Sequence, residues 1–108
     1  MDNDKIAFFQ KYKECADEDV LETIWQAKVE KKTFLYLSES KISDLSPLED
    51  FYNLSRLFVS DTQITDLNPI VNLKDLTFLD ISGTKVEDLT PLEGLLNLEE
   101  LKIGRAHV

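Results

Sequence analysis

Hydrophobic residues recur along most of this chain at a fixed spacing of 22 positions. Three columns keep their residue type at each step: Ile42, Ile64 and Val86; Asp44, Asp66 and Asp88; Pro47, Pro69 and Pro91. Short alternating apolar pairs accompany them: Leu35-x-Leu37, Leu57-x-Val59, Leu79-x-Ile81 and Leu101-x-Ile103. Alternation with a period of two predicts short strands whose paired residues point to one side. Self-similarity at this period, with a leucine skeleton, predicts a solenoid in which each repeat forms one coil.

The segment after each strand is expected to turn and return through a short helix. The turn positions carry hydroxyl residues: Ser40, Thr62 and Thr84. A polar residue and a proline follow, in the order Ser46-Pro47, Asn68-Pro69 and Thr90-Pro91. A capping residue before a proline is typical of a helix start, and Glu49 and Glu93 are positioned to complete capping boxes. Each coil is therefore predicted to return through a short helix or 3₁₀ turn.

Residues 1–33 lack the repeat and are predicted to form two helices. The first carries a broad apolar stripe: Ile6, Phe8, Phe9, Tyr12 and Cys15. In the second, Asp19 is the expected N-cap, with Glu22 completing a capping box. Its apolar face follows helical spacing: Val20, Leu21, Ile24, Trp25 and Ala27. Because the end of a solenoid must be covered, this helix is expected to be the N-terminal cap, with core roles for Cys15 and Trp25.

The pattern from Leu54 to Leu73, repeated from Leu76 to Leu95, resembles the 22-residue leucine-rich repeats of bacterial internalin-like proteins. The resemblance covers about residues 33–103, and the Asp-Leu-x-Pro-Leu element makes it specific. The asparagine usual at the turn is replaced by Ser or Thr, whose hydroxyl can still bond to a neighbouring backbone group. The resemblance implies an α/β solenoid with short parallel strands on the concave face. It also implies a binding scaffold, usually for proteins, with the ligand on that face.

Three segments are predicted: a helical N-terminal cap (1–33), leucine-rich repeats with about three coils and a partial fourth (34–102), and a non-native tail (103–108). The tail has the sequence Ile-Gly-Arg-Ala-His-Val, which reads like a translation of common sequencing-adapter DNA. The hypothesis is that the natural chain continues past about Lys102, so that this sequence is an N-terminal fragment. The last coil is then expected to expose an unpaired strand edge.

The residues between the inward leucines form two outward columns on the strand face. The register aligns Phe34, Arg56, Phe78 and Glu100 in one column, and Tyr36, Phe58, Asp80 and Lys102 in the other. Neighbouring strands lie about 4.8 Å apart, so the aromatic residues are expected to form one patch with Arg56 among them. Exposed aromatic residues and arginine are typical of binding hot spots, and cation–π packing of Arg56 is expected. The candidate partner-binding residues are Phe34, Tyr36, Arg56, Phe58, Phe78 and Asp80.

An alternative leaves this face without a ligand: the rings shelter one another or contact a missing segment. The aspartate column likewise has two interpretations. It resembles a carboxylate row for calcium, but acids near helix starts more often complement the turn and the helix dipole. The aligned serines, Ser38, Ser60 and Ser82, lack a general base, since the one histidine lies in the suspected tail.

Composition excludes several functions. The 108 residues suffice for one domain, and the formal charge of −9 with two arginines disfavours nucleic acid and anionic membranes. Residues 1–33 hold eight acids against six lysines, whereas residues 34–102 hold thirteen acids against five bases. One cysteine and one histidine predict neither an intramolecular disulfide nor a zinc site, and the dispersed glycines form no phosphate loop. No metal, cofactor or small-molecule substrate is expected.

The leading prediction is a non-catalytic protein-interaction module that binds an unidentified protein partner through the concave strand face. One alternative is the recognition region of a larger enzyme or effector whose catalytic domain is missing. Another is a repeat stack that only caps or spaces other domains. The sequence shows no secretory signal and no apolar run long enough to insert into a membrane. The cytoplasm is the default expectation, with secretion by a signal-less route left open.

Overall fold

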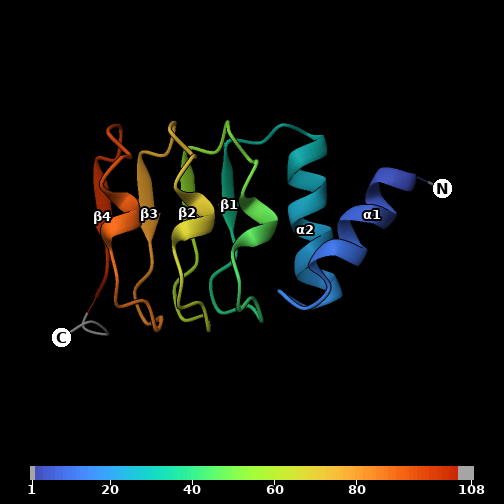
Figure 1. The fold of residues 1–108 in the computed structure, drawn as a ribbon, viewed down its shortest axis with the longest axis horizontal. Coiled ribbons are helices and arrows are strands. Elements are labelled where there is room, and N and C mark those ends of the chain that lie inside the picture. The colour runs from blue at the N-terminus through green and yellow to red at the C-terminus, as the bar shows by residue number, and fades with distance from the viewer. Residues whose placement is uncertain (1, 105–108) are drawn as a thin grey trace.

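The computed structural model describes residues 2–104, which stack as parallel coils behind two helices (Figure 1). The helices are α1 (Asn3–Tyr12) and α2 (Glu18–Val29). Each coil contributes one strand: β1 (Phe34–Tyr36), β2 (Arg56–Phe58), β3 (Phe78–Asp80) and β4 (Glu100–Lys102). The coils return through 3₁₀ helices: η1 (Ser46–Leu48), η2 (Asn68–Ile70) and η3 (Thr90–Leu92). The predicted leucine-rich-repeat solenoid with helical returns and a helical N-terminal region is confirmed.

The 22-residue spacing becomes the register of a four-stranded parallel sheet. The strands follow in sequence order, and Leu35 pairs with Leu57, Leu57 with Leu79, and Leu79 with Leu101. Equal coil lengths therefore stack the same repeat position on itself. The inward leucines of β2 and β3 are fully buried, as the alternating pattern predicts.

The 3₁₀ helices do not have the predicted capping boxes. Ser46 lies inside η1, the N-cap position belongs to Leu45, and Glu49 follows the helix as its C-cap. An aspartate two residues upstream takes the capping role instead. The Asp44 carboxylate accepts hydrogen bonds from the Ser46 N–H at 2.9 Å and from the Ser46 hydroxyl at 2.7 Å. A three-residue helix has too few turns for a reciprocal box, so a local turn bond satisfies its first N–H group.

The hydroxyl turns behave as predicted in two of the three coils. The Thr62 hydroxyl donates to the Val59 carbonyl and the Thr84 hydroxyl to the Ile81 carbonyl, each at 2.7 Å. In the first coil, the buried Ser40 hydroxyl has no partner within the described residues.

A second set of bonds between coils was not predicted from the sequence. The Asn53 side-chain amide donates to the Lys31 and Lys32 carbonyls at 3.2 Å, and that of Asn97 donates to the Lys74 carbonyl at 2.9 Å. These two asparagines lie 44 positions apart, two repeats of the register, and Asp75 occupies the position between them. They tie the start of one coil to the preceding one.

The helix α2 covers the first coil with the predicted face. Val20, Leu21, Ile24 and Ala27 are buried, and Trp25 packs against the core at intermediate exposure. The predicted N-cap, Asp19, is wrong: Asp17 caps the helix by accepting from the Val20 N–H at 3.1 Å. The helix therefore starts earlier than the capping-box pattern indicated, and Asp19 lies in its exposed first turn.

The helix α1 is fastened to the first coil by aromatic and polar contacts. Phe8 and Tyr12 are buried, with ring centroids 5.1 Å apart. The Tyr12 hydroxyl donates to Glu49 at 2.9 Å; burial, and then this bond, raise the pKa of the phenol. Cys15 is buried at the end of this segment, as predicted, and burial raises the pKa of its thiol.

Two findings concern the remaining predictions about the chain. Within residues 2–104, no helix combines the length and apolar character needed to cross a membrane. Residues 105–108, which make up most of the predicted non-native tail, lie outside the part that the structure describes.

The inward leucine column should dominate stability. Replacing the fully buried Leu57 by alanine is expected to lower the free energy of unfolding by about 2–5 kcal/mol, because it leaves a cavity between adjacent coils. Leu96→Ala is the matched control, since Leu96 is 89% exposed and should change stability by less than about 0.5 kcal/mol. Urea unfolding followed by circular dichroism measures both. Equal losses would contradict the assignment of the core.

Candidate functional site

The outward side chains of the strands form the candidate site. The sheet register places Arg56 between Phe34 and Phe78, and Phe58 between Tyr36 and Asp80. These two columns are the ones that the sequence predicts. Because the strands are only three residues long, the rest of this face is made by the turns that follow them.

Three rings form a continuous stack across the sheet. The ring centroids of Tyr36 and Phe58 are 5.1 Å apart, and those of Phe58 and Phe78 are 4.8 Å apart. The stack therefore crosses from one outward column to the other at Phe58. Tyr36 is 67% exposed and Phe58 is half-buried, so the stack is open to solvent at its β1 end.

Arg56 lies over the stack, as predicted. Its guanidinium carbon is 4.7 Å from the Phe78 ring centroid and 5.7 Å from that of Phe58. The Lys102 ammonium lies 5.9 Å from the Phe78 ring. Phe78 is consequently only 6% exposed, which differs from the expectation that it belongs to an exposed patch. Phe78 packs against the Phe58 ring, and the long side chains of Arg56 and Lys102 cover it.

The remaining candidate residues lie outside the stack. Phe34 is 52% exposed and has the Lys32 ammonium 5.9 Å from its ring centroid; among the described aromatic pairs, none includes Phe34. The Asp80 carboxylate is engaged by its own turn, because it accepts from the Ser82 N–H at 3.0 Å and from the Ser82 hydroxyl. The predicted single patch is thus a stack of three rings with a separate ring beside Lys32.

The sequence places Lys102 in an outward column, but neither it nor Lys32 is among the candidate binding residues predicted from the sequence. Lys32 and Lys102 each place an ammonium near an aromatic ring. The repeat register provided a signal for Lys102, which occupies an outward strand position. Lys32 gave none, because it precedes the first strand and belongs to no repeat column.

Two of the aligned serines, Ser38 and Ser60, form hydrogen bonds that link adjacent coils. The Ser60 hydroxyl donates to the Ser38 hydroxyl at 2.8 Å, and the Ser60 N–H donates to the same oxygen at 3.1 Å. A nucleophilic serine of the triad type needs an adjacent imidazole or a comparable base. The chain's one histidine, His107, lies outside the described residues.

The aspartate column serves the turns, which was the favoured of its two interpretations. Asp66 accepts from the Asn68 N–H and Asp88 from the Thr90 N–H, both at 2.9 Å, in the same geometry as Asp44. The bonds from Thr90 hold the pKa of the Asp88 carboxyl below its ordinary value. Within residues 2–104, no three acidic, histidine or cysteine side chains are grouped as metal ligands.

Comparison with known proteins agrees with this architecture. Residues 52–94 match the family of Leucine Rich repeats (2 copies). An internalin (inlF) from Listeria monocytogenes is 31% identical with a TM-score of 0.60; the match covers 66% of this chain and 20% of that one. An internalin C2 (inlC2) from the same organism is 21% identical with a TM-score of 0.75, which shows a shared fold; the match covers 83% of this chain and 46% of that one. No curated protein sequence matches the chain.

The chain is therefore a leucine-rich-repeat solenoid that is similar to these Listeria internalins. It spans less than half the length of either internalin.

The hydrogen bonds that the Asp88 carboxylate accepts from Thr90 should make the free energy of unfolding depend on pH in the acidic range. The folded-state pKa of this carboxyl is lowered, so the stabilisation by the carboxylate is fully present above the unfolded pKa of about 3.9. It is lost as the pH falls through the folded pKa. The difference in unfolding free energy between wild type and Asp88→Ala should therefore be constant near neutral pH and shrink below about pH 4.

Asp88→Asn is the control for this experiment, because it keeps an acceptor oxygen and does not titrate. Thermal unfolding across a pH series measures both variants. A difference between wild type and Asp88→Ala that persists unchanged at about pH 2 would contradict a role for the ionised carboxyl.

Proposed function

We propose that this chain is a non-catalytic protein-interaction module that binds a protein partner through its strand face. The observation that supports the proposal is the stack of Tyr36, Phe58 and Phe78 with the Arg56 guanidinium over it. Tyrosine and arginine are, with tryptophan, the residues most enriched among binding hot spots. The internalin-like fold agrees with this role.

The stack is suited to binding because it is largely ordered before a partner arrives. Phe78 is buried, and Phe58 is held between two rings. Immobilising a free side chain on binding costs about 0.5–1.5 kcal/mol of conformational entropy. A pre-formed stack avoids much of this cost, which favours tighter binding. Tyr36 supplies the most exposed ring, and its hydroxyl can donate to a partner acceptor.

Arg56 suits a carboxylate of the partner. Among the ion pairs of residues 2–104, none involves Arg56, although the repeat region holds thirteen acids. The Arg56 guanidinium lies over the Phe78 ring. The N–H groups of a guanidinium can in addition bind a carboxylate bidentately. A partner with an acidic residue beside an apolar one fits this surface.

The test requires a partner identified with the wild-type chain, by affinity capture and mass spectrometry, and then purified. Tyr36→Ala and Arg56→Ala should each weaken its binding by about thirtyfold or more, the effect of losing a hot-spot residue. Isothermal titration calorimetry measures the change, and circular dichroism checks that the fold is retained.

Tyr52→Ala is the matched control. Tyr52 is also an exposed tyrosine, at 61%, but it lies in the loop before β2 and outside the sheet. Its loss should leave affinity within about twofold. Unchanged binding by both strand-face variants would exclude this face as the interaction surface.

A further inference from the structure

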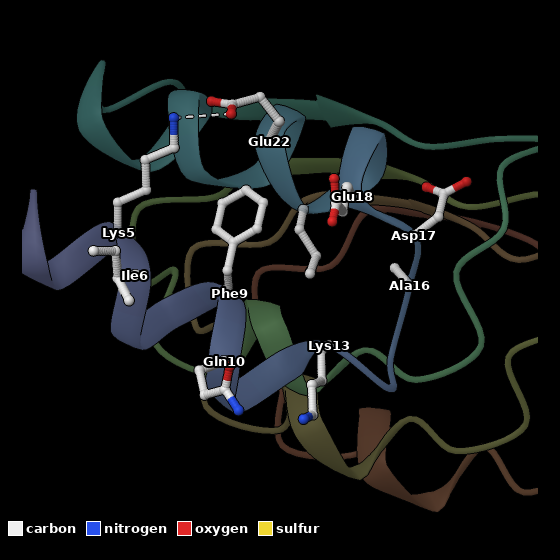
Figure 2. A pocket seen from close by; sticks show the side chains of 10 residues that line it. Lys5, Ile6, Phe9, Gln10, Lys13, Ala16, Asp17, Glu18 and Glu22 are labelled. Carbon is white, nitrogen blue, oxygen red and sulfur yellow. Dashed lines mark ion pairs between the residues drawn. The ribbon is translucent and has the colours of Figure 1, made fainter. Parts of the chain in front are cut away.

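A groove of about 670 Å³ is lined by residues of α1, of α2 and of the turn between them, the two helices at the N-terminal end of the stack (Figure 1). Its apolar surface comes from Ile6 and Phe9 of α1 and from Ala16 of the connecting turn; Leu21 of α2 also borders it but is only 1% exposed. Figure 2 shows Phe9 projecting between the two helices, with Ile6 on the near side of α1. The volume is that of a typical ligand site.

The groove arises because the apolar stripe of α1 is broader than the part that the core covers. Phe8 and Tyr12 face the core and are buried. Phe9 packs against the edge of the core and is half-buried, whereas Ile6 is 49% exposed. A helix that covers one end of a solenoid needs only the apolar residues that face the core, so the exposed edge of the stripe at Ile6 is not explained by capping.

Both ends of the groove are closed by contacts in the structure. The Lys5 ammonium and the Glu22 carboxylate pair at 2.9 Å and bridge the helices at one end. The turn at Ala16 and Asp17 closes the other. Along α1 the open part runs from Ile6 to the level of Lys13, which corresponds to about two helical turns, or roughly 10 Å.

The backbone around the groove favours a helix as its occupant. Both walls are helices, whose backbone groups are bonded internally, so an incoming strand finds no edge with which to pair. A helix satisfies its own backbone and needs only an apolar stripe to fill the space. Packing of an amphipathic helix into an apolar groove is a general mode of recognition.

The rims of the groove carry opposite charges. Lys13 lies on the α1 side and Glu18 on the α2 side, both exposed. Neither takes part in an ion pair within residues 2–104. The N-terminal segment is also nearly balanced in charge, with eight acids and six lysines in residues 1–33. A partner helix with charges of both signs is therefore complementary to this part of the molecule.

We propose that this groove is a second protein-binding surface, which receives about two turns of an amphipathic helix from a partner protein. The apolar stripe of that helix lies on Ile6, Phe9 and Ala16. One flank carries an acidic residue toward Lys13, and the other carries a basic residue toward Glu18. The groove shares no lining residue with the stack of Tyr36, Phe58 and Phe78 on the strand face.

The test uses the full chain and a synthetic helical peptide of about 20 residues, which exceeds the length of about 12–15 residues below which isolated helices are marginal in water. The peptide has one leucine stripe, glutamates along one flank and lysines along the other. Titration into isotopically labelled chain, followed by NMR, should shift the signals of residues near Phe9 and Leu21 and leave those of the strand face unchanged.

Two kinds of variant distinguish the groove from other surfaces. Ile6→Glu should weaken peptide binding about tenfold to a hundredfold, because it places a charge against the leucine stripe. Val29→Glu is the matched control, because Val29 is 57% exposed on α2 and does not line the groove. This variant should bind the peptide with the affinity of the wild type.

The rim charges are tested by reversal. Lys13→Glu alone makes both rims acidic and should weaken binding about threefold to tenfold. The double variant Lys13→Glu, Glu18→Lys should restore it, because a helix can lie in the groove in either direction. Lys41→Glu, an exposed change in the repeat region, controls for net charge.

Three results would overturn the proposal. The first is no detectable binding of the peptide up to about 1 mM. The second is equal binding by the wild type and Ile6→Glu. The third is a dimer of the chain that Ile6→Glu dissociates, measured by light scattering without peptide, since the occupant would then be a second copy.

Discussion

Stacking of equal coils is the constraint on which the rest of this structure depends. A single coil cannot bury its own apolar residues, because its inward side chains are covered only when another coil lies against them. The column of Leu35, Leu57 and Leu79 shows how this is solved: identical positions pair through the parallel sheet and fill one continuous core. Three kinds of side-chain hydrogen bond recur for the same reason: those accepted by the Asp44 carboxylate, donated by the Thr62 hydroxyl and donated by the Asn53 amide. Equivalent positions in other coils make the same bonds because the register repeats the residue types.

The same constraint explains the two helices at the N-terminal end. The first coil has no preceding coil to cover it, so α2 supplies Leu21, Ile24 and Ala27 in its place. Lys28 pairs with Asp50 of the first coil, and Asn53 bonds to the chain that leaves α2. The helix α1 then packs on α2 and on the first coil through Phe8 and Tyr12. The edge of its apolar stripe, at Ile6 and Phe9, stays partly exposed and forms one wall of the groove.

On the strand face, the register brings together residues that lie 22 positions apart. Their neighbours decide how much of each side chain is exposed. Arg56 and Lys102 lie over Phe78, so an outward ring becomes a buried support. Tyr36 lies on the first strand of the sheet, with a neighbouring strand on one side only, and remains exposed. The two ends of one aromatic stack therefore differ in their access to a partner.

The sequence by itself determined the strands, their register, the inward leucine column and the hydroxyl turns. Each of these follows from a local period or from spacing that stacking preserves. The tertiary structure decided the burial of Phe78, the capping by Asp17 and Asp44, and the groove beside Phe9. A period tells which side of an element a residue faces. It does not tell what a neighbouring coil or helix places over that side, because this depends on the reach of long side chains and on the angle between elements.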